Sequence, residues 1–317
     1  ISQNKPLIVA IEDLHWIDKA SEEFINYFID WIANRNILLI LLYRPEYRHQ
    51  WDSRSIYTKI GVEQLDLHES GELVKAVLEE GEMEETLRQF VLDRSTGNPL
   101  FIEEFTHTLK ENGSIVKQDH EYVLKENPEN IQVPDTIQGI IAARLDRLEN
   151  NLKQTMQVAS VIGRDFAFKI LQTITGMKNE LKTYLRNLQG MEFIYEKNLF
   201  PELEYIFKHA LTQEVAYNSL LQEKRKKIHE RIGDAIEKIY PERIEEFYEM
   251  LAYHYSKSSL SDKAIHFSRL AGKKAQRSYS HWDAYYFFRQ AFDILASQKE
   301  DEENIRQKIE LLGIMVL

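Results

Sequence analysis

The sequence contains no cysteine among its 317 residues. This absence excludes a disulfide framework, a thiolate nucleophile and a cysteine-ligated zinc site. It is compatible with a reducing compartment, and we expect the protein to be cytoplasmic. The longest apolar run, residues 37–43, is far shorter than the roughly 20 apolar residues that cross a bilayer, so no transmembrane helix is predicted.

Basic residues are in the minority, with 40 Lys and Arg against 51 Asp and Glu and a formal net charge of −11. Such a chain is not attracted as a whole to nucleic acid or to an anionic membrane. The basic run at residues 224–227 lies among acidic residues in a helical pattern and is interpreted as a solvated face. We therefore expect neither nucleic acid nor a membrane as a partner.

The usual signals of a chain start are also missing. The first residue is Ile1, and residues 1–6 lead into an apolar run without the basic, apolar and small-residue regions of a signal peptide. We expect the chain to be cut from a longer protein.

The first pattern that is present is strand, helix, strand. Short apolar runs at 7–11 and 37–43 are predicted to be fully buried strands. The stretch between them, 21–34, is predicted to be a helix with five apolar residues on one face: Phe24, Ile25, Phe28, Ile29 and Ile32. This order predicts a βαβ unit with a parallel sheet.

Everything after residue 67 is predicted to be mainly helical, so the fold class is α/β followed by all-α. Helices at 69–80 and 83–94 and a third that begins at Pro99 form a small helical lid, 67–114. The region 115–222 is predicted to be a winged helix. Its elements are a hairpin at 115–124, a helix after residue 136, helices at 152–162, 166–175 and 179–191, and strands at 193–195 and 205–207.

The remaining residues, 223–317, are predicted to form helical hairpins like tetratricopeptide repeats. One apolar stripe contains Ile228, Ile232, Ala235, Ile236 and Ile239. The pattern Ala-x-x-Phe-x-Arg-x-Ala occurs at Ala264 and again at Ala284, and its small residues allow helices to approach closely. The offset of 20 residues is shorter than a repeat of about 34, which predicts successive helices rather than successive repeats.

The first predicted strand ends in two carboxylates, Glu12 and Asp13. An apolar strand that delivers acids at its C-terminal end suits phosphoryl transfer, in which Mg²⁺ must be held against phosphates and a water must be oriented. A solvated strand end explains these two residues equally well.

The continuation Glu12-Asp-Leu-His-Trp-Ile-Asp18 resembles the signature of predicted ATPases of the STAND class, relatives of AAA ATPases found behind cyclase and kinase domains and in large transcriptional regulators. The resemblance extends over the whole chain through residues 42–46, 96–101 and 207–211. It implies ATP/ADP and Mg²⁺ as cofactors. It places Glu12 at the magnesium position of Walker B, Asp13 at the water-activating position and Arg44 at the sensor position that reports the γ-phosphate.

The same resemblance assigns Gly97 and Pro99 to the lid element that packs on adenine, and His209 to a histidine that touches the β-phosphate of ADP. A helix boundary that needs Gly and Pro for backbone reasons, and a structural histidine, remain open alternatives. Relatives often place Asp after that histidine, whereas Ala210 follows here. His15, Trp16 and Asp18 have no assigned role, although Asp18 or Ser21 suits the N-cap of the next helix.

The phosphate loop G-x-x-x-x-G-K-[ST] is missing from the sequence. Without backbone amides and a lysine to bind phosphates, the chain is predicted to be inactive alone, with its phosphate loop upstream. The predicted domains are therefore 1–66, the C-terminal part of a P-loop ATPase core, then the lid, the winged helix and the helical tail.

We expect a regulatory ATP switch whose tail senses a protein partner or inducer. One alternative is a non-enzymatic interaction scaffold with a degenerate ATPase core. A winged-helix DNA-binding regulator is a weaker alternative, because the charge is acidic and no basic recognition helix is evident.

Overall fold

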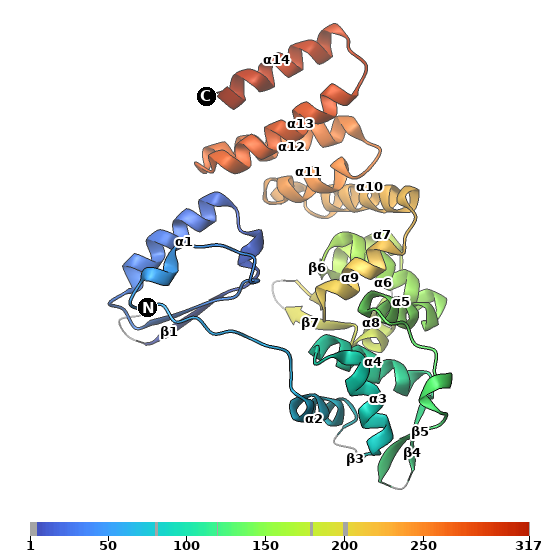
Figure 1. Cartoon of the computed structure of the whole chain (residues 1–317). Coiled ribbons are helices and arrows are strands. Elements are labelled where there is room, and N and C mark those ends of the chain that lie inside the picture. The colour runs from blue at the N-terminus through green and yellow to red at the C-terminus, as the bar shows by residue number, and fades with distance from the viewer. Residues whose placement is uncertain (1–4, 80–81, 119, 178–179, 199–201, 317) are drawn as a thin grey trace.

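The computed structural model describes residues 5–79, 82–118, 120–177, 180–198 and 202–316. The chain is mixed α/β and mostly helical, as predicted. Four hydrophobic cores follow one another along the sequence. Figure 1 shows the region of α2 to α4 at the bottom, that of α5 to α9 in the middle and the helical tail at the top, with the N-terminal unit to one side. Within the described residues, no helix combines the length and the apolar character needed to cross a membrane.

The N-terminal unit is the predicted βαβ unit. Strands β1 (Leu7–Ile11) and β2 (Ile37–Leu41) pair in parallel, with Leu7 opposite Ile37 and Ile11 opposite Leu41. Helix α1 (Lys19–Ile32) connects them, after the short helix η1 (Leu14–Trp16). The N-cap of α1 is Asp18, whose side chain accepts a hydrogen bond from the Ser21 backbone nitrogen at 2.9 Å.

The prediction that both strands are fully buried is wrong. Their side chains alternate between half-buried and exposed, and Ile8 is 67% exposed. The two-stranded sheet packs through one face only, where Ile11, Leu39 and Leu41 meet the core formed with α1. Apolar composition identified the strands, but it could not reveal how many layers cover them.

The predicted apolar face of α1 is correct for Ile25, Ile29 and Ile32, which are buried. It is wrong for Phe24, which is 63% exposed. Phe24 stacks on Phe28, which in turn stacks on Trp31, so these rings form an aromatic row on the outer side of the helix.

An extended segment, 54–66, leads to the lid, which has its own core. Its elements are α2 (Leu67–Val77), β3 (Glu82–Met83), α3 (Glu85–Ser95), α4 (Pro99–Glu111), β4 (Ile115–Gln118) and β5 (Glu121–Leu124). The predicted hairpin is confirmed as β4 and β5, and residue 119 lies outside the described residues. The predicted place of this hairpin with the region 115–222 is wrong, because Ile115, Tyr122 and Leu124 pack in the core of the lid and β5 pairs with β3. The helix predicted from Met83 starts two residues later, because Glu82 and Met83 pair with β5.

The next region follows the short helix η3 (Pro128–Asn130). Its elements are α5 (Ile137–Arg147), α6 (Asn150–Ile162), β6 (Asp165–Ala167), α7 (Phe168–Thr175), α8 (Glu180–Gly190), β7 (Ile194–Asn198), β8 (Glu204–Phe207) and α9 (Ala210–Asn218). Thr136 caps α5, because its hydroxyl oxygen accepts a hydrogen bond from Gly139 N at 3.1 Å. The helix predicted from Phe166 begins at Phe168, because residues 165–167 pair with β8 in an antiparallel sheet of order β6-β8-β7. The winged-helix assignment stays a prediction.

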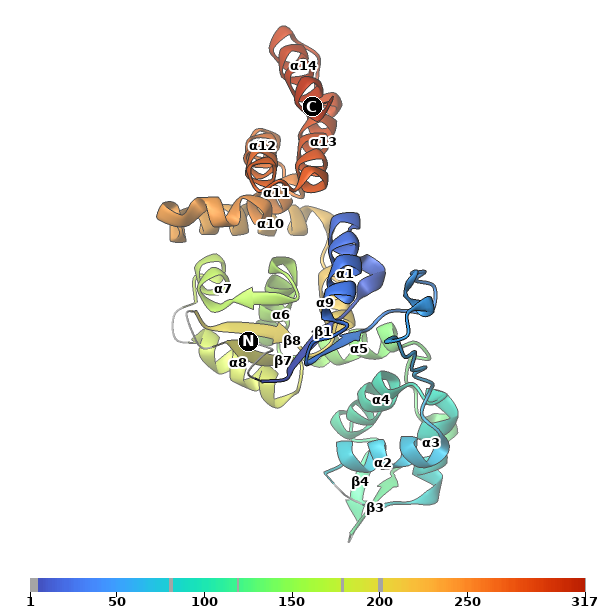
Figure 2. The same ribbon diagram turned by 90° about the vertical axis from the view of Figure 1, so that its left-hand side faces the viewer.

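The tail is helical throughout its described length, as predicted. Its elements are α10 (Gln222–Ile239), η4 (Pro241–Phe247), α11 (Tyr248–Ser256), α12 (Ser261–Arg277), α13 (His281–Ser297) and α14 (Glu302–Val316). Figure 2 shows these helices stacked beyond the region of α5 to α9. The two copies of the internal pattern lie on α12 and α13, which are successive helices. They approach so closely that a Cβ on Gly272 would lie 2.7 Å from the Phe288 ring.

Candidate functional site

The ends of β1 and β2 bring three of the predicted site residues to one edge of the sheet. Glu12 and Asp13 follow β1, and Arg44 comes three residues after the end of β2. Backbone hydrogen bonds from Leu42 N to Ile11 O at 2.9 Å and from Leu14 N to Leu42 O at 3.1 Å keep the two strand ends together. All three side chains are exposed. We call Glu12, Asp13 and Arg44 the carboxylate edge.

Asp13 has an unusual backbone, with φ 56° and ψ 35° in the left-handed region. This conformation costs a residue with a Cβ about 1–2 kcal/mol. It is maintained because the next residue, Leu14, is buried in the core of the unit and because Trp16 N donates to Asp13 O at 2.9 Å. Strain of this kind is often found at functional positions.

Arg44 is fixed by its neighbours. Tyr47 N donates to Arg44 O at 3.0 Å, which closes a turn through Pro45. The Tyr47 hydroxyl donates to Glu22 on α1 at 2.8 Å, and burial, assisted by Glu22, raises the pKa of Tyr47. On the other side, Tyr43 is hydrogen-bonded to His49 at 2.8 Å. The backbone that carries the guanidinium is therefore held on both sides.

His15 and Trp16 lie directly beside the carboxylate edge in η1. Both ring nitrogens of His15 are buried and have no hydrogen-bond partner within the described part of the chain. Trp16 is 78% exposed, so it does not serve as a packing residue. Buried polar atoms without a partner are uncommon in folded proteins.

Gly97 and Pro99 lie at the junction of α3 and α4. Gly97 has φ +75°, and a Cβ there would lie 2.3 Å from the Leu65 carbonyl oxygen. The Asn98 side chain caps α4 by accepting from Phe101 N at 3.1 Å, and Pro99 occupies the first turn. Backbone geometry thus accounts for these residues, and their contact with adenine stays a prediction.

His209 is brought to α4, the helix that begins at Pro99. Its Nε2 lies 3.2 Å from a carboxylate oxygen of Glu103, one turn beyond Pro99. No hydrogen bond or ion pair between described residues joins Pro99 or His209 to the carboxylate edge. The phosphate contact of His209 therefore stays a prediction as well.

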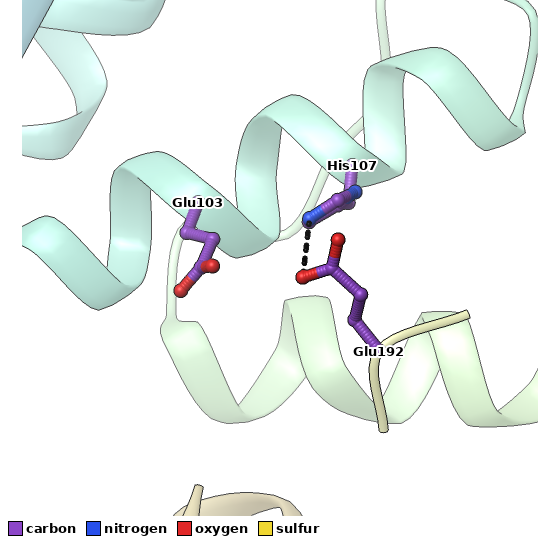
Figure 3. Close-up of side chains that lie close together, drawn as sticks. All are labelled: Glu103, His107 and Glu192. Carbon is purple, nitrogen blue, oxygen red and sulfur yellow. Dashed lines mark ion pairs between the residues drawn. The ribbon is translucent and has the colours of Figure 1, made fainter. Parts of the chain in front are cut away.

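Glu103 belongs to a cluster that the sequence did not reveal. Oxygen and nitrogen atoms of Glu103, His107 and Glu192 lie within 4.8 Å of one another, which is a spacing suited to a metal ion (Figure 3). However, the ammonium of Lys208 donates hydrogen bonds to both carboxylates, Glu103 and Glu192, and so takes the place of a metal ion. The neighbouring side chains of His209 and Lys208 lower the pKa of Glu103 to about 2. The only local signal was the spacing of four residues between Glu103 and His107.

No family model matches the chain. An uncharacterized protein of Rhizobium meliloti (strain 1021) is 25% identical over 324 residues, which cover 100% of this chain and 30% of that protein. The crystal structure of a STAND protein with a tetratricopeptide repeat sensor from Pyrococcus horikoshii is similar with a TM-score of 0.50 and 12% sequence identity. That similarity covers 98% of this chain and 56% of the other. The chain therefore has a STAND-like fold, and it spans less than two thirds of either similar protein.

Proposed function

We propose that the chain is part of a regulatory ATP-binding and ATP-hydrolysing switch in a multidomain signalling protein. The observation that carries the proposal is the carboxylate edge, where two acids and an arginine follow the C-terminal ends of two paired parallel strands. Ligands of open α/β sheets bind at this end. The similarity to a STAND protein with a repeat sensor supports the same proposal at the level of fold.

The residues suit the proposed roles. Glu12 and Asp13 are exposed and offer hard oxygen ligands, which are what Mg²⁺ requires. Glu12 would hold the metal, Asp13 would orient the attacking water, and the Arg44 guanidinium would contact the γ-phosphate. Bound Mg²⁺–ATP would supply the reactive phosphoanhydride bond and the metal that offsets its charge. The sequence has no phosphate loop, so we expect the chain by itself to lack ATPase activity.

Asp13→Asn provides the test, in a longer protein that also contains an upstream phosphate loop. We expect hydrolysis to fall about 10²–10⁴-fold, since removal of a general base has effects of this size. Asp18→Asn is the matched control, because Asn also caps a helix well and Asp18 serves as the N-cap of α1. A longer protein that binds no nucleotide would contradict the proposal, as would equal activities of the two variants.

A second candidate function is a scaffold for a protein partner, in which the ATPase core is degenerate. A groove of about 640 Å³ between α12, the end of α13 and α14 favours this role for the tail. Buried Ile265 and Leu295 contribute to its lining, together with charged side chains from α12 and α14. Partner binding that survives Asp13→Asn and needs no nucleotide would favour the scaffold over the switch.

A further inference from the structure

Three aromatic side chains next to Arg44 form a hydrogen-bonded cluster to which the proposed reaction gives no role. The Tyr43 hydroxyl lies 2.8 Å from Nε2 of His49 and 2.5 Å from the hydroxyl of Tyr57. The Tyr57 hydroxyl lies 3.3 Å from the same Nε2, so each of the three groups contacts both of the others. We call Tyr43, His49 and Tyr57 the tyrosine–histidine cluster.

The backbone determines the direction of the hydrogen bonds in this cluster. Trp51 N donates to Nδ1 of His49 at 3.3 Å, so Nδ1 is the acceptor and Nε2 carries the ring proton. Nε2 therefore donates to the Tyr43 hydroxyl oxygen, and Tyr43 donates its own proton to Tyr57. Burial, assisted by Tyr43, raises the pKa of Tyr57, which keeps its hydroxyl protonated. Linked hydrogen bonds of this kind reinforce one another and hold the Tyr43 ring in one orientation.

The cluster is anchored in the core of the N-terminal unit. The His49 side chain is only 3% exposed, and its ring stacks on the Trp51 ring with the centroids 4.7 Å apart. Trp51 is 1% exposed, and its indole nitrogen donates to the Asn26 side chain of α1 at 2.5 Å. The cluster is therefore attached to helix α1 as well as to its own loop.

Tyr43 immediately precedes Arg44 and sets the direction in which Arg44 leaves the backbone. Exposure alternates here, since Leu41 and Tyr43 are half-buried whereas Leu42 and Arg44 are exposed. Successive side chains of an extended chain point to opposite sides. An anchored Tyr43 ring thus turns Arg44 away from the core, and the hydrogen bond from Leu42 N to Ile11 O keeps this segment beside the end of β1.

The Arg44 side chain depends on this support. Its guanidinium has no hydrogen-bond or ion-pair partner among the residues that the structure describes. A long side chain without partners loses much rotamer freedom when it binds a ligand, and a preorganised backbone reduces what remains to be ordered. An anchored Tyr43 therefore favours the bidentate contact that a guanidinium makes with phosphate oxygens.

On the basis of the proposed function, we propose that Tyr43, His49 and Tyr57 are positioning residues that direct the Arg44 guanidinium toward the γ-phosphate of ATP. The three side chains do not touch the nucleotide in this arrangement. They act through Arg44, and so they contribute to the distinction between ATP and ADP, which lacks the γ-phosphate.

Tyr43→Phe provides the test, in the longer protein with an upstream phosphate loop, because it keeps the ring and removes only the hydroxyl. We expect hydrolysis at saturating Mg²⁺–ATP to fall about ten- to hundredfold, as it does when a catalytic group is displaced by about 1 Å. The affinity for ADP, measured by titration calorimetry, should stay unchanged. His49→Gln retains an N–H donor and should keep most of the activity, whereas His49→Leu should act like Tyr43→Phe.

The matched control is Tyr240→Phe, which removes a hydroxyl that donates to Glu202 at 2.5 Å, beyond the end of α10. It should leave hydrolysis unchanged. A double-mutant cycle with Arg44→Ala separates positioning from a purely structural role. In the Arg44→Ala background, Tyr43→Phe should have no further effect on hydrolysis.

Two different failures can be told apart in this cycle. If Tyr43→Phe has its full effect in both backgrounds, or lowers ADP affinity as much as hydrolysis, the positioning role is refuted and the proposed function is untouched. If Arg44→Ala itself leaves hydrolysis unchanged, the role of Arg44 in the proposed function is wrong, and the positioning role is refuted with it.

Discussion

At Gly97 a single residue satisfies two backbone requirements. Its φ of +75° favours glycine, and its carbonyl oxygen accepts a hydrogen bond from Leu65 N at 2.9 Å. A side chain would enter the space taken by the Leu65 carbonyl oxygen. The extended 54–66 segment is thereby fixed to the start of α4, and so the residue has a structural role whether or not adenine packs beside Pro99.

Gly97→Ala should lower the free energy of unfolding by roughly 3 kcal/mol or more, because left-handed strain of about 1–2 kcal/mol adds to overlap that costs about 1–3 kcal/mol. Gly113→Ala is the matched control, since φ there is +73° and nothing lies within 4 Å of the position that a Cβ would take. It should cost only about 1–2 kcal/mol. Urea unfolding followed by circular dichroism measures both, and equal losses would show that the contact with Leu65 is unimportant.

At the scale of elements, local pattern predicted most helices and the strands of four or five residues. The failures concern features that only tertiary contacts decide. The two-residue strand β3 and the three-residue strand β6 exist because β5 and β8 pair with them, and their sequences carry little signal. The prediction that β1 and β2 are fully buried was wrong, because apolar composition does not specify what covers a strand.

In the candidate site, too, local sequence predicts some features and tertiary contacts decide others. The placement of Glu12, Asp13 and Arg44 at one edge of the sheet could be predicted, because each follows an apolar strand and parallel strands end at the same edge. Their roles toward ATP stay predictions. The cluster around Lys208 could not be predicted, because its contact with Glu103 spans 105 residues. One sequence provides no information on pairs so far apart.

Two helices of the tail are also joined by a pair of buried histidines. His229 on α10 and His254 on α11 are buried, and their Nδ1 atoms lie 2.9 Å apart, so one donates and the other accepts. Burial lowers the pKa of both, assisted by Lys257 and Arg225 at His229 and by His229 at His254. The folded tail therefore contains both histidines in the neutral form.

Below about pH 6.5 the histidines of the unfolded chain bind protons that the buried histidines do not. Their contribution to the free energy of unfolding should therefore be fully present above that pH and should decrease as the pH falls. The expected slope is up to about 1.4 kcal/mol per pH unit for each histidine. His229→Gln should reduce this slope, whereas His281→Gln, at an exposed position, should not. Thermal melts between pH 8 and pH 4 measure it, and identical slopes in the two variants would contradict the explanation.

On the scale of the whole molecule, the N-terminal unit is an almost separate body. Its core contains only residues of the first 57, and Figure 1 shows the extended segment that connects it to α2. No hydrogen bond or ion pair between described residues joins 5–57 to the chain beyond 66, although the ammonium of Lys19 lies over the Trp282 ring at 5.5 Å. Its orientation therefore depends on the connecting segment more than on packing.

Limited trypsin digestion should cut first after Lys59, because residues 58–64 are exposed and, within the described chain, form no backbone hydrogen bond. We expect the fragment that begins at residue 60 to persist and to elute separately from the N-terminal fragment in size-exclusion chromatography. Lys59→Gln should delay this cut, whereas Lys182→Gln, on helix α8, should not. Fragments that elute together would show that the contact of Lys19 with Trp282 is part of a larger stable interface. In that case, the carboxylate edge would be held in a fixed orientation relative to the tail, and a signal sensed by the tail could reach it directly.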